Sequence, residues 1–190
     1  MAEPAGVTFQ PAVPRRSKGS VKMLIDEFRR YCEHLYRMTV DFVAIVPQDK
    51  WDFSPDPPGK SGDAPILHRI GDGLAPFCKQ LRHVVCVRGV YNAALVTKRV
   101  DWAQKHTHYT GPLTRASLLT ALIDKQRQLL AALETVDIEA PIDWGGTAFS
   151  FADFTWEFVQ HEAIHHGQWS VYASLAGFET PLSWRLSWGL

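Results

Sequence analysis

The chain has 190 residues, which is enough for one well-packed core and short for two, so we expect one domain. Hydrophobic residues make up 46% of the chain and aromatic residues 12%, which excludes a disordered composition. The 20 Lys and Arg residues equal the 20 Asp and Glu residues in number and are scattered, so the charge pattern points neither to nucleic acid nor to an anionic membrane as a partner.

The cysteines and the N-terminal residues indicate the cellular compartment of the protein. Cys32, Cys78 and Cys86 are an odd number and form no CxxC pair, which argues against a disulfide framework and favours a reducing cytoplasm. Residues 1–19 are rich in proline and lack the apolar stretch of a signal peptide. We therefore expect a cytoplasmic protein with no membrane span, made of a flexible leader (1–19) and one helical domain (20–190).

The first predicted helix follows this leader, with Ser20 as its N-cap and Pro47 just after its end. Its apolar residues recur at steps of three and four, the spacing of a helix packed in a bundle. They are Leu24, Phe28, Tyr31, Leu35, Met38, Phe42 and Ile45. Residues 48–66 are rich in Pro, Gly and Asp, which predicts a loop.

Two more helices are predicted in the middle of the chain. The second begins between Ala64 and Pro76 and runs to Thr97, with His83 on its inner stripe. The third has Thr114 as its N-cap, and its inner stripe runs on to Val136. Residues 137–149 then break the helical pattern and predict a connection.

The fourth predicted helix begins after Ser150, which forms a capping-box pattern with Asp153, and ends at Gly177. Its inner stripe holds two histidines among mainly apolar residues: Phe154, Phe158, His161, His165, Gln168, Tyr172 and Leu175. The tail from 178 to 190 carries Trp184 and Trp188, which we expect to pack on the bundle or on a second subunit.

His161 and His165 are four residues apart, so both imidazoles project from one face of a helix and can bind one metal ion. The alternative is a pair of core histidines bonded to hydroxyls or carbonyls, and the chelating spacing favours the metal. Catalytic metal sites commonly use three protein ligands, and His83 is the best third candidate.

Glu162 and Gln168 are the candidate catalytic residues. The segment His161-Glu162-Ala163-Ile164-His165 also fits the zinc-peptidase pattern HExxH, in which the glutamate activates water. The longer metzincin form of this pattern requires a glycine and a further ligand where this chain has Gln168 and Val171, so that subclass is excluded. Gln168 lies one turn beyond His165 and could orient a ligand, or it could bridge two helices.

The segment from Phe158 to Gln168 resembles the last-helix signature of the DinB/YfiT-like superfamily, in which two histidines separated by three residues precede a Gly-Gln pair. His83, within Leu81-Arg82-His83-Val84-Val85, is similar to the helix-two ligand of that family. An arginine is usual where this chain has His166. The resemblance implies an all-α four-helix bundle of up-down-down-up type, often dimeric, with a three-histidine site for zinc, nickel or a similar ion.

Members of that family include thiol S-transferases and a thiol-dependent isomerase, so the resemblance implies a metal-dependent enzyme that uses a low-molecular-weight thiol and a small-molecule substrate. Two other hypotheses stay open. One is a metallohydrolase with Glu162 as the base, and the other is a metal-binding homodimer without catalysis. Fold and metal site together do not choose among the three.

Overall fold

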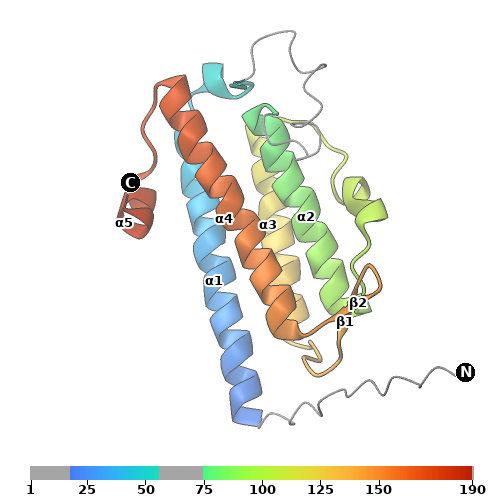
Figure 1. The fold of residues 1–190 in the computed structure, drawn as a ribbon. Coiled ribbons are helices and arrows are strands. Elements are labelled where there is room, and N and C mark those ends of the chain that lie inside the picture. The colour runs from blue at the N-terminus through green and yellow to red at the C-terminus, as the bar shows by residue number, and fades with distance from the viewer. Residues whose placement is uncertain (1–17, 56–74, 190) are drawn as a thin grey trace, which may run out of the picture.

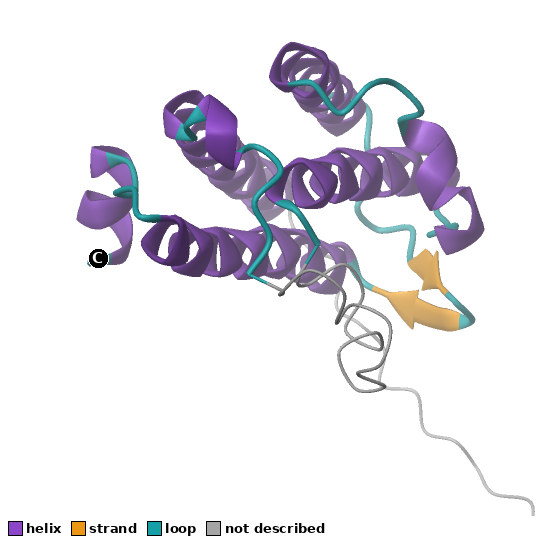
Figure 2. Ribbon diagram, turned by 90° about the horizontal axis from the view of Figure 1, so that it is seen from above, coloured by secondary structure: helices purple, strands orange, loops and turns teal. Residues whose placement is uncertain are grey.

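The computed structural model describes residues 18–55 and 75–189. Its long helices α1 to α4 lie side by side, and Figure 2 shows the same bundle from above. The elements are α1 (Lys18–Ile45), the 3₁₀ helix η1 (Gln48–Lys50), α2 (Phe77–Thr97), the 3₁₀ helix η3 (Trp102–His108), α3 (Arg115–Leu133), β1 (Ile142–Trp144), β2 (Thr147–Phe149), α4 (Phe151–Ala176) and α5 (Leu182–Trp188).

Helices α2 and α3 both begin beside the end of α1 (Figure 1). The Cys78 N–H donates to the Trp51 carbonyl just after α1 (3.2 Å), and the Trp51 indole N–H donates to the Leu113 carbonyl just before α3 (2.7 Å). The far end of α3 lies near the first half of α1, where Arg29 pairs with Glu134 (2.8 Å). Both helices therefore run opposite to α1.

Helix α4 runs in the same direction as α1. Its first residue, Phe151, contacts Phe28 in the first half of α1 with ring centroids 5.8 Å apart. Beyond its last turn, Phe178 contacts Phe42 near the end of α1, with centroids 5.9 Å apart. These aromatic pairs fix the two helices along their whole length.

The C-terminal helix α5 folds back onto α1. Trp184 is fully buried and its indole N–H donates to the Met38 carbonyl (2.8 Å). Trp188, one turn later, is 45% exposed. The expected packing on the bundle is thus confirmed for Trp184, whereas packing of Trp188 on a second subunit stays a prediction.

Three predicted helix ends are confirmed. Thr114 caps α3, because its side chain accepts from the Ser117 N–H. Ser150 and Asp153 form a complete capping box at the start of α4. Gly177 ends α4 in the left-handed conformation (φ 80°), which glycine adopts without strain.

The limits and the buried stripe of α1 differ from the prediction. The helix begins at Lys18, so Ser20 lies inside it and is not its N-cap. Tyr31 and Ile45 are 53% and 40% exposed, whereas Cys32 and Thr39 are fully buried. The buried face is displaced because α1 packs against both α3 and α4, a choice that helical spacing alone does not specify. In α4, Leu175 is likewise exposed.

The predicted connection 137–149 contains a hairpin that the sequence pattern did not reveal (Figure 2). Gly145 and Gly146 form its turn with φ values of 62° and 94°. Hydrogen bonds of 2.8 Å join Asp143 to Val100 and Lys98, just after α2. Strands of three residues are too short to show an alternating pattern, so only the tertiary pairing defines them.

The core consists of two apolar clusters with polar residues between them. One cluster is centred on Phe28, Tyr91 and Phe158, and the other on Phe42 and Trp169. The buried polar and charged residues are Thr39, Gln80, Arg88, Asn92, Gln126, Glu162, His165 and His166. Along α3 and α4, Gln126 and Glu162 fall between the two clusters, so a polar layer crosses the middle of the bundle.

No helix among the described residues is long and apolar enough to cross a membrane. The predicted leader, up to residue 17, and most of the predicted loop 48–66 lie outside the described residues.

Candidate metal centre

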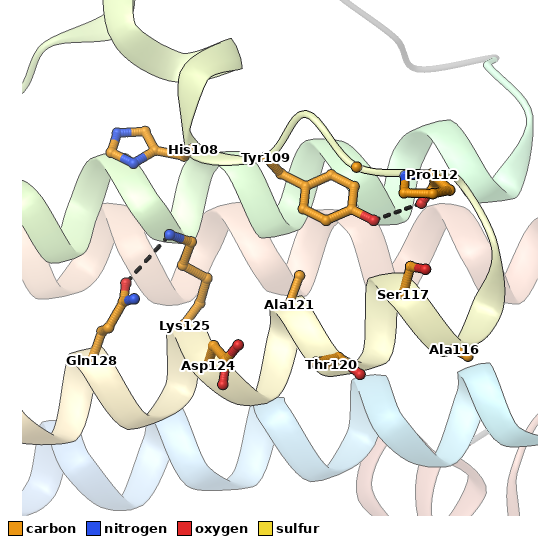
Figure 3. Close-up of a pocket in the computed structure, with 11 residues that line it drawn as sticks. His108, Tyr109, Pro112, Ala116, Ser117, Thr120, Ala121, Asp124, Lys125 and Gln128 are labelled. Carbon is orange, nitrogen blue, oxygen red and sulfur yellow. Dashed lines mark hydrogen bonds between the residues drawn. The ribbon is translucent and has the colours of Figure 1, made fainter.

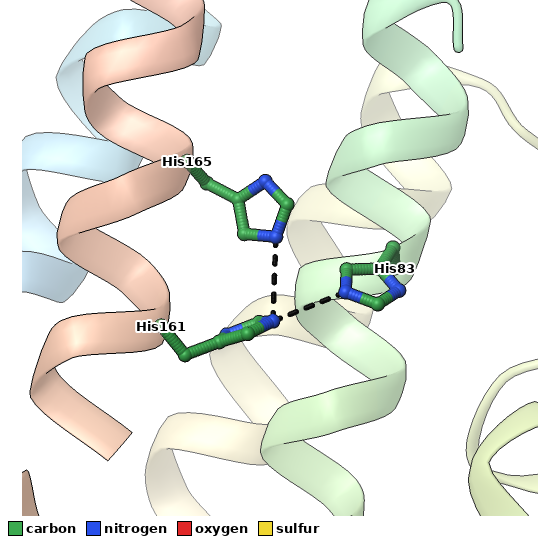
Figure 4. A group of neighbouring side chains, drawn as sticks. All are labelled: His83, His161 and His165. Carbon is green, nitrogen blue, oxygen red and sulfur yellow. Dashed lines mark hydrogen bonds between the residues drawn. The ribbon is translucent and has the colours of Figure 1, made fainter. Parts of the chain in front are cut away.

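His83, His161 and His165 come together between the middle of α2 and the middle of α4 (Figure 4). The Nε2 atom of His161 lies 3.0 Å from Nε2 of His83 and 3.3 Å from Nε2 of His165. The structure therefore brings together the three residues that the sequence singled out as ligands. The pair on α4 comes from local helical geometry, and His83 comes from the packing of α2 against α4.

The spacing of these nitrogens suits a small divalent ion. Tetrahedral zinc at the usual Zn–N distance places neighbouring ligand nitrogens about 3.3 Å apart. The distances at His161 are close to that value. A neutral imidazole nitrogen offers either one hydrogen or one lone pair, so Nε2 of His161 cannot hydrogen-bond well to both neighbours. A cation accepts all three lone pairs at once, and the donor set therefore fits the expected metal.

The protonation state of the cluster also favours metal binding. Burial, then the nearby imidazoles of His165 and His83, lower the pKa of His161 well below its ordinary value. His161 is therefore neutral at pH 7, the form in which an imidazole binds a metal.

Gln168 lies one turn beyond His165 on α4 and is partly buried. Its Oε1 atom is buried and has no hydrogen-bond partner among the described residues. An unpaired buried carbonyl oxygen is costly, so this atom is available to a bound water or ligand. The proposed role of Gln168 in orienting a ligand stays a prediction.

Glu162 is placed differently from what the HExxH pattern requires. Its two carboxylate oxygens accept from Arg88, Oε1 from Nε at 2.5 Å and Oε2 from Nη2 at 2.7 Å. Both side chains are almost fully buried, with exposed fractions of 1% and 2%. A carboxylate held by a guanidinium at both oxygens is a poor base for activating water, so this geometry opposes the catalytic role predicted for Glu162.

Arg88 is the residue that sequence reasoning missed. It lies inside an almost continuous apolar run on α2, and all residues from Val84 to Asn92 are buried. An arginine within such a run needs a buried anion as its partner. The charged residue in the apolar run was therefore the sequence feature that could have predicted a buried ion pair. The structure supplies Glu162 as that anion.

Three further described histidines, His106, His108 and His166, lie apart from the cluster. His166 follows His165 in sequence, but its Nε2 shares a hydrogen bond with Thr39 on α1 (2.8 Å) and its ring packs on Trp184. Burial, then Arg88, lowers its pKa to about 3. His106 is exposed and His108 packs against α2 at Gly89, so neither reaches the metal ligands.

A groove of about 540 Å³ opens between α3 and the segment after η3 (Figure 3). Its rim includes the Tyr109 hydroxyl, which donates to the Pro112 carbonyl, and Lys125, which donates to Gln128. Asp124 lies among the same residues, so the lining has mixed charge and suits no single ligand class. None of the three clustered histidines lines it.

The bundle and the three converging imidazoles define a helix-bundle protein with a candidate divalent-metal centre. The family model of the DinB superfamily matches residues 31–169, more than half of the chain, and the chain belongs to this superfamily. The resemblance in the last helix is thereby confirmed.

A solved structure of a DinB-like protein from Bacillus subtilis has the same fold, with a TM-score of 0.53 at 13% sequence identity. The match covers 85% of this chain and 97% of that chain. No curated protein matches the chain.

Proposed function

We propose that His83, His161 and His165 bind one divalent metal ion and that the loaded protein is a metal-dependent enzyme of the thiol S-transferase or isomerase type. The observation that carries the metal site is the position of His161 Nε2, within 3.3 Å of Nε2 of both other histidines. Three ligands leave at least one coordination position for an exogenous group. We propose zinc or nickel, which are both among the metals that imidazole donors suit.

Thiol chemistry is the reaction class that membership of the DinB superfamily and the open ligand position support together. A bound divalent ion supplies the acidity that turns a thiol into a thiolate. The chain contributes the neutral imidazoles and the Oε1 atom of Gln168, which can orient a bound group. Its own Cys86 does not compete for this role, because burial raises the pKa of that thiol and the thiol faces the Tyr109 carbonyl.

The hydrolase alternative receives less support, because Arg88 occupies both oxygens of Glu162. We also propose the up-down-down-up arrangement and the homodimer of the family. The helix directions set by contacts at Trp51 and Phe28 support the first. Exposed apolar side chains on α4 and α5, such as Leu175 and Leu186, support the second.

Metal content tests the proposal directly. Elemental analysis of the untagged protein should find about one ion per chain, as expected for a single specific site. Alanine at His83, His161 or His165 should each abolish it while circular dichroism shows an unchanged helix content. His106→Ala removes an exposed histidine and serves as the matched control. A metal-free wild type that resists loading would favour three core histidines.

A thiol assay then separates the reaction classes. With metal bound, consumption of an electrophile such as chlorodinitrobenzene should require an added thiol and should fail in His161→Ala. Hydrolysis of an ester that is lost in Glu162→Gln while the metal stays bound would instead support the hydrolase.

A further inference from the structure

The buried polar layer is centred on one side chain that touches every long helix. Arg88 of α2 donates to Glu162 on α4 and, through Nη1, to Gln126 on α3 at 2.6 Å. Its guanidinium lies 5.7 Å from the ring centroid of Tyr36 on α1 and 5.6 Å from that of Phe158 on α4. This one arginine therefore contacts residues of all four long helices.

Stability alone does not account for such a pair. Removing two charges from water costs several kcal/mol per ion, and apolar residues of similar volume are often as stable or more stable in the same place. A bidentate pair is, however, strongly directional. Sliding one helix by a single residue moves it about 1.5 Å and would break both hydrogen bonds, whereas the hydrophobic attraction between apolar side chains does not depend on direction.

The pair is close to the metal ligands on both helices. Glu162 directly follows His161 on α4, and Arg88 lies five residues after His83 on α2, which corresponds to about 7.5 Å along the helix. Over that distance a helix behaves as a rigid rod, so fixing Arg88 against Glu162 also fixes His83 against His161. Both contacts between α2 and α4 are short: 2.7 Å between Arg88 and Glu162, and 3.0 Å between the imidazoles of His83 and His161.

We infer that Arg88 and Glu162 form a positioning pair, which sets the register of α2 against α4 and so brings His83 to the two histidines of α4. Neither residue touches the ligand nitrogens in this role. The part of this inference that concerns metal affinity rests on the proposed function, and the part that concerns helix register does not.

The test replaces both charges by apolar residues, in Arg88→Met/Glu162→Leu, and compares this variant with wild type in two measurements. Cobalt titration, followed by absorption of the bound ion, should show affinity weakened at least about tenfold, as for other outer-shell partners of metal ligands. A crystal structure of the metal-free variant should show that the 3.0 Å contact between His83 and His161 is lost. Circular dichroism should show an unchanged helix content and denaturant a single cooperative transition, which excludes general unfolding as the cause even if the loss of the donor to Gln126 lowers the midpoint.

Two further variants complete the experiment. Arg29→Gln/Glu134→Gln removes an exposed ion pair between α1 and the end of α3, and should leave cobalt affinity and the histidine contact unchanged. Arg88→Lys keeps the charge but cannot form the bidentate fork, so it should weaken cobalt binding even where the double variant fails to fold.

Wild-type affinity and an unchanged His83–His161 contact in folded Arg88→Met/Glu162→Leu would overturn the positioning role. If wild type binds no cobalt, the proposed function fails. The crystallographic comparison then decides the register claim by itself, because the histidine contact is measured without metal.

Discussion

At the scale of single residues, the interior of this protein depends on polar groups that have specific buried partners. Arg88 has Glu162, and Thr39 has His166. A buried polar group that loses its partner costs more than the hydrogen bond contributed, since it cannot return to water. Substitution of such a partner should therefore be costly even where volume is conserved.

Thr39→Val tests this at a fully buried position. The substitution removes the hydroxyl bonded to Nε2 of His166, whose Nδ1 already lacks a hydrogen-bond partner among the described residues. The free energy of unfolding should fall by about 1 to 3 kcal/mol in urea denaturation. Thr155→Val is the control, because that hydroxyl bonds within its own helix, and it should change stability by no more than about 0.5 kcal/mol. Equal effects of the two substitutions would contradict the argument.

The raised pKa of the buried Cys78 thiol should make the free energy of unfolding depend on pH. The thiol donates to Asp52 (3.0 Å), and burial followed by this hydrogen bond raises its pKa from 9.0 to about 12. Between these values the unfolded chain has released the thiol proton and the folded chain retains it, so stability declines as pH rises above 9.0. Denaturant unfolding at a series of pH values should show a shallower decline in Cys78→Ala. Parallel curves for the two proteins would disprove the assignment.

At the scale of elements, the close approach of η3 to α2 depends on a glycine. A Cβ at Gly89 would lie 2.5 Å from Cβ of His108, so the backbone of one element would have to move. Gly167, in the middle of α4, has open space at the same position. The two glycines therefore serve different purposes, although both lie inside helices.

Alanine at these two glycines should have opposite effects. Gly89→Ala should lower the free energy of unfolding by about 1 to 3 kcal/mol through overpacking. Gly167→Ala should raise it by about 0.5 to 1 kcal/mol, because alanine loses less backbone entropy in a helix. Thermal and urea unfolding of both variants would check the signs. A stable Gly89→Ala would mean that η3 packs more loosely on α2 than the structure shows.

At the scale of the whole molecule, the proposed metal between α2 and α4 would link ligand binding to folding. An ion that binds only the folded chain should raise the free energy of unfolding by about 2.7 kcal/mol at a free concentration one hundred times its Kd. Calorimetry with zinc and then with a chelator should show this gain and its reversal. In His161→Ala the same additions should leave the unfolding temperature unchanged, and a shift there would place the ion elsewhere.

The sequence by itself determined the features that depend on neighbouring residues. Thr114, Ser150 and Gly177 marked helix ends through caps that are satisfied within one turn, and the four-residue spacing placed His161 and His165 on one face. The inner stripe of the second predicted helix singled out His83, which the structure places beside this pair.

Only the tertiary structure decided features that need two distant segments. It selected the buried stripe of α1, where Cys32 is buried and Tyr31 is exposed, and it paired the short strands of the hairpin. It also assigned Glu162 to Arg88, a contact that opposes the role the HExxH pattern suggested. Local patterns record propensity and spacing, whereas the partner of a buried charge is set by how whole helices pack.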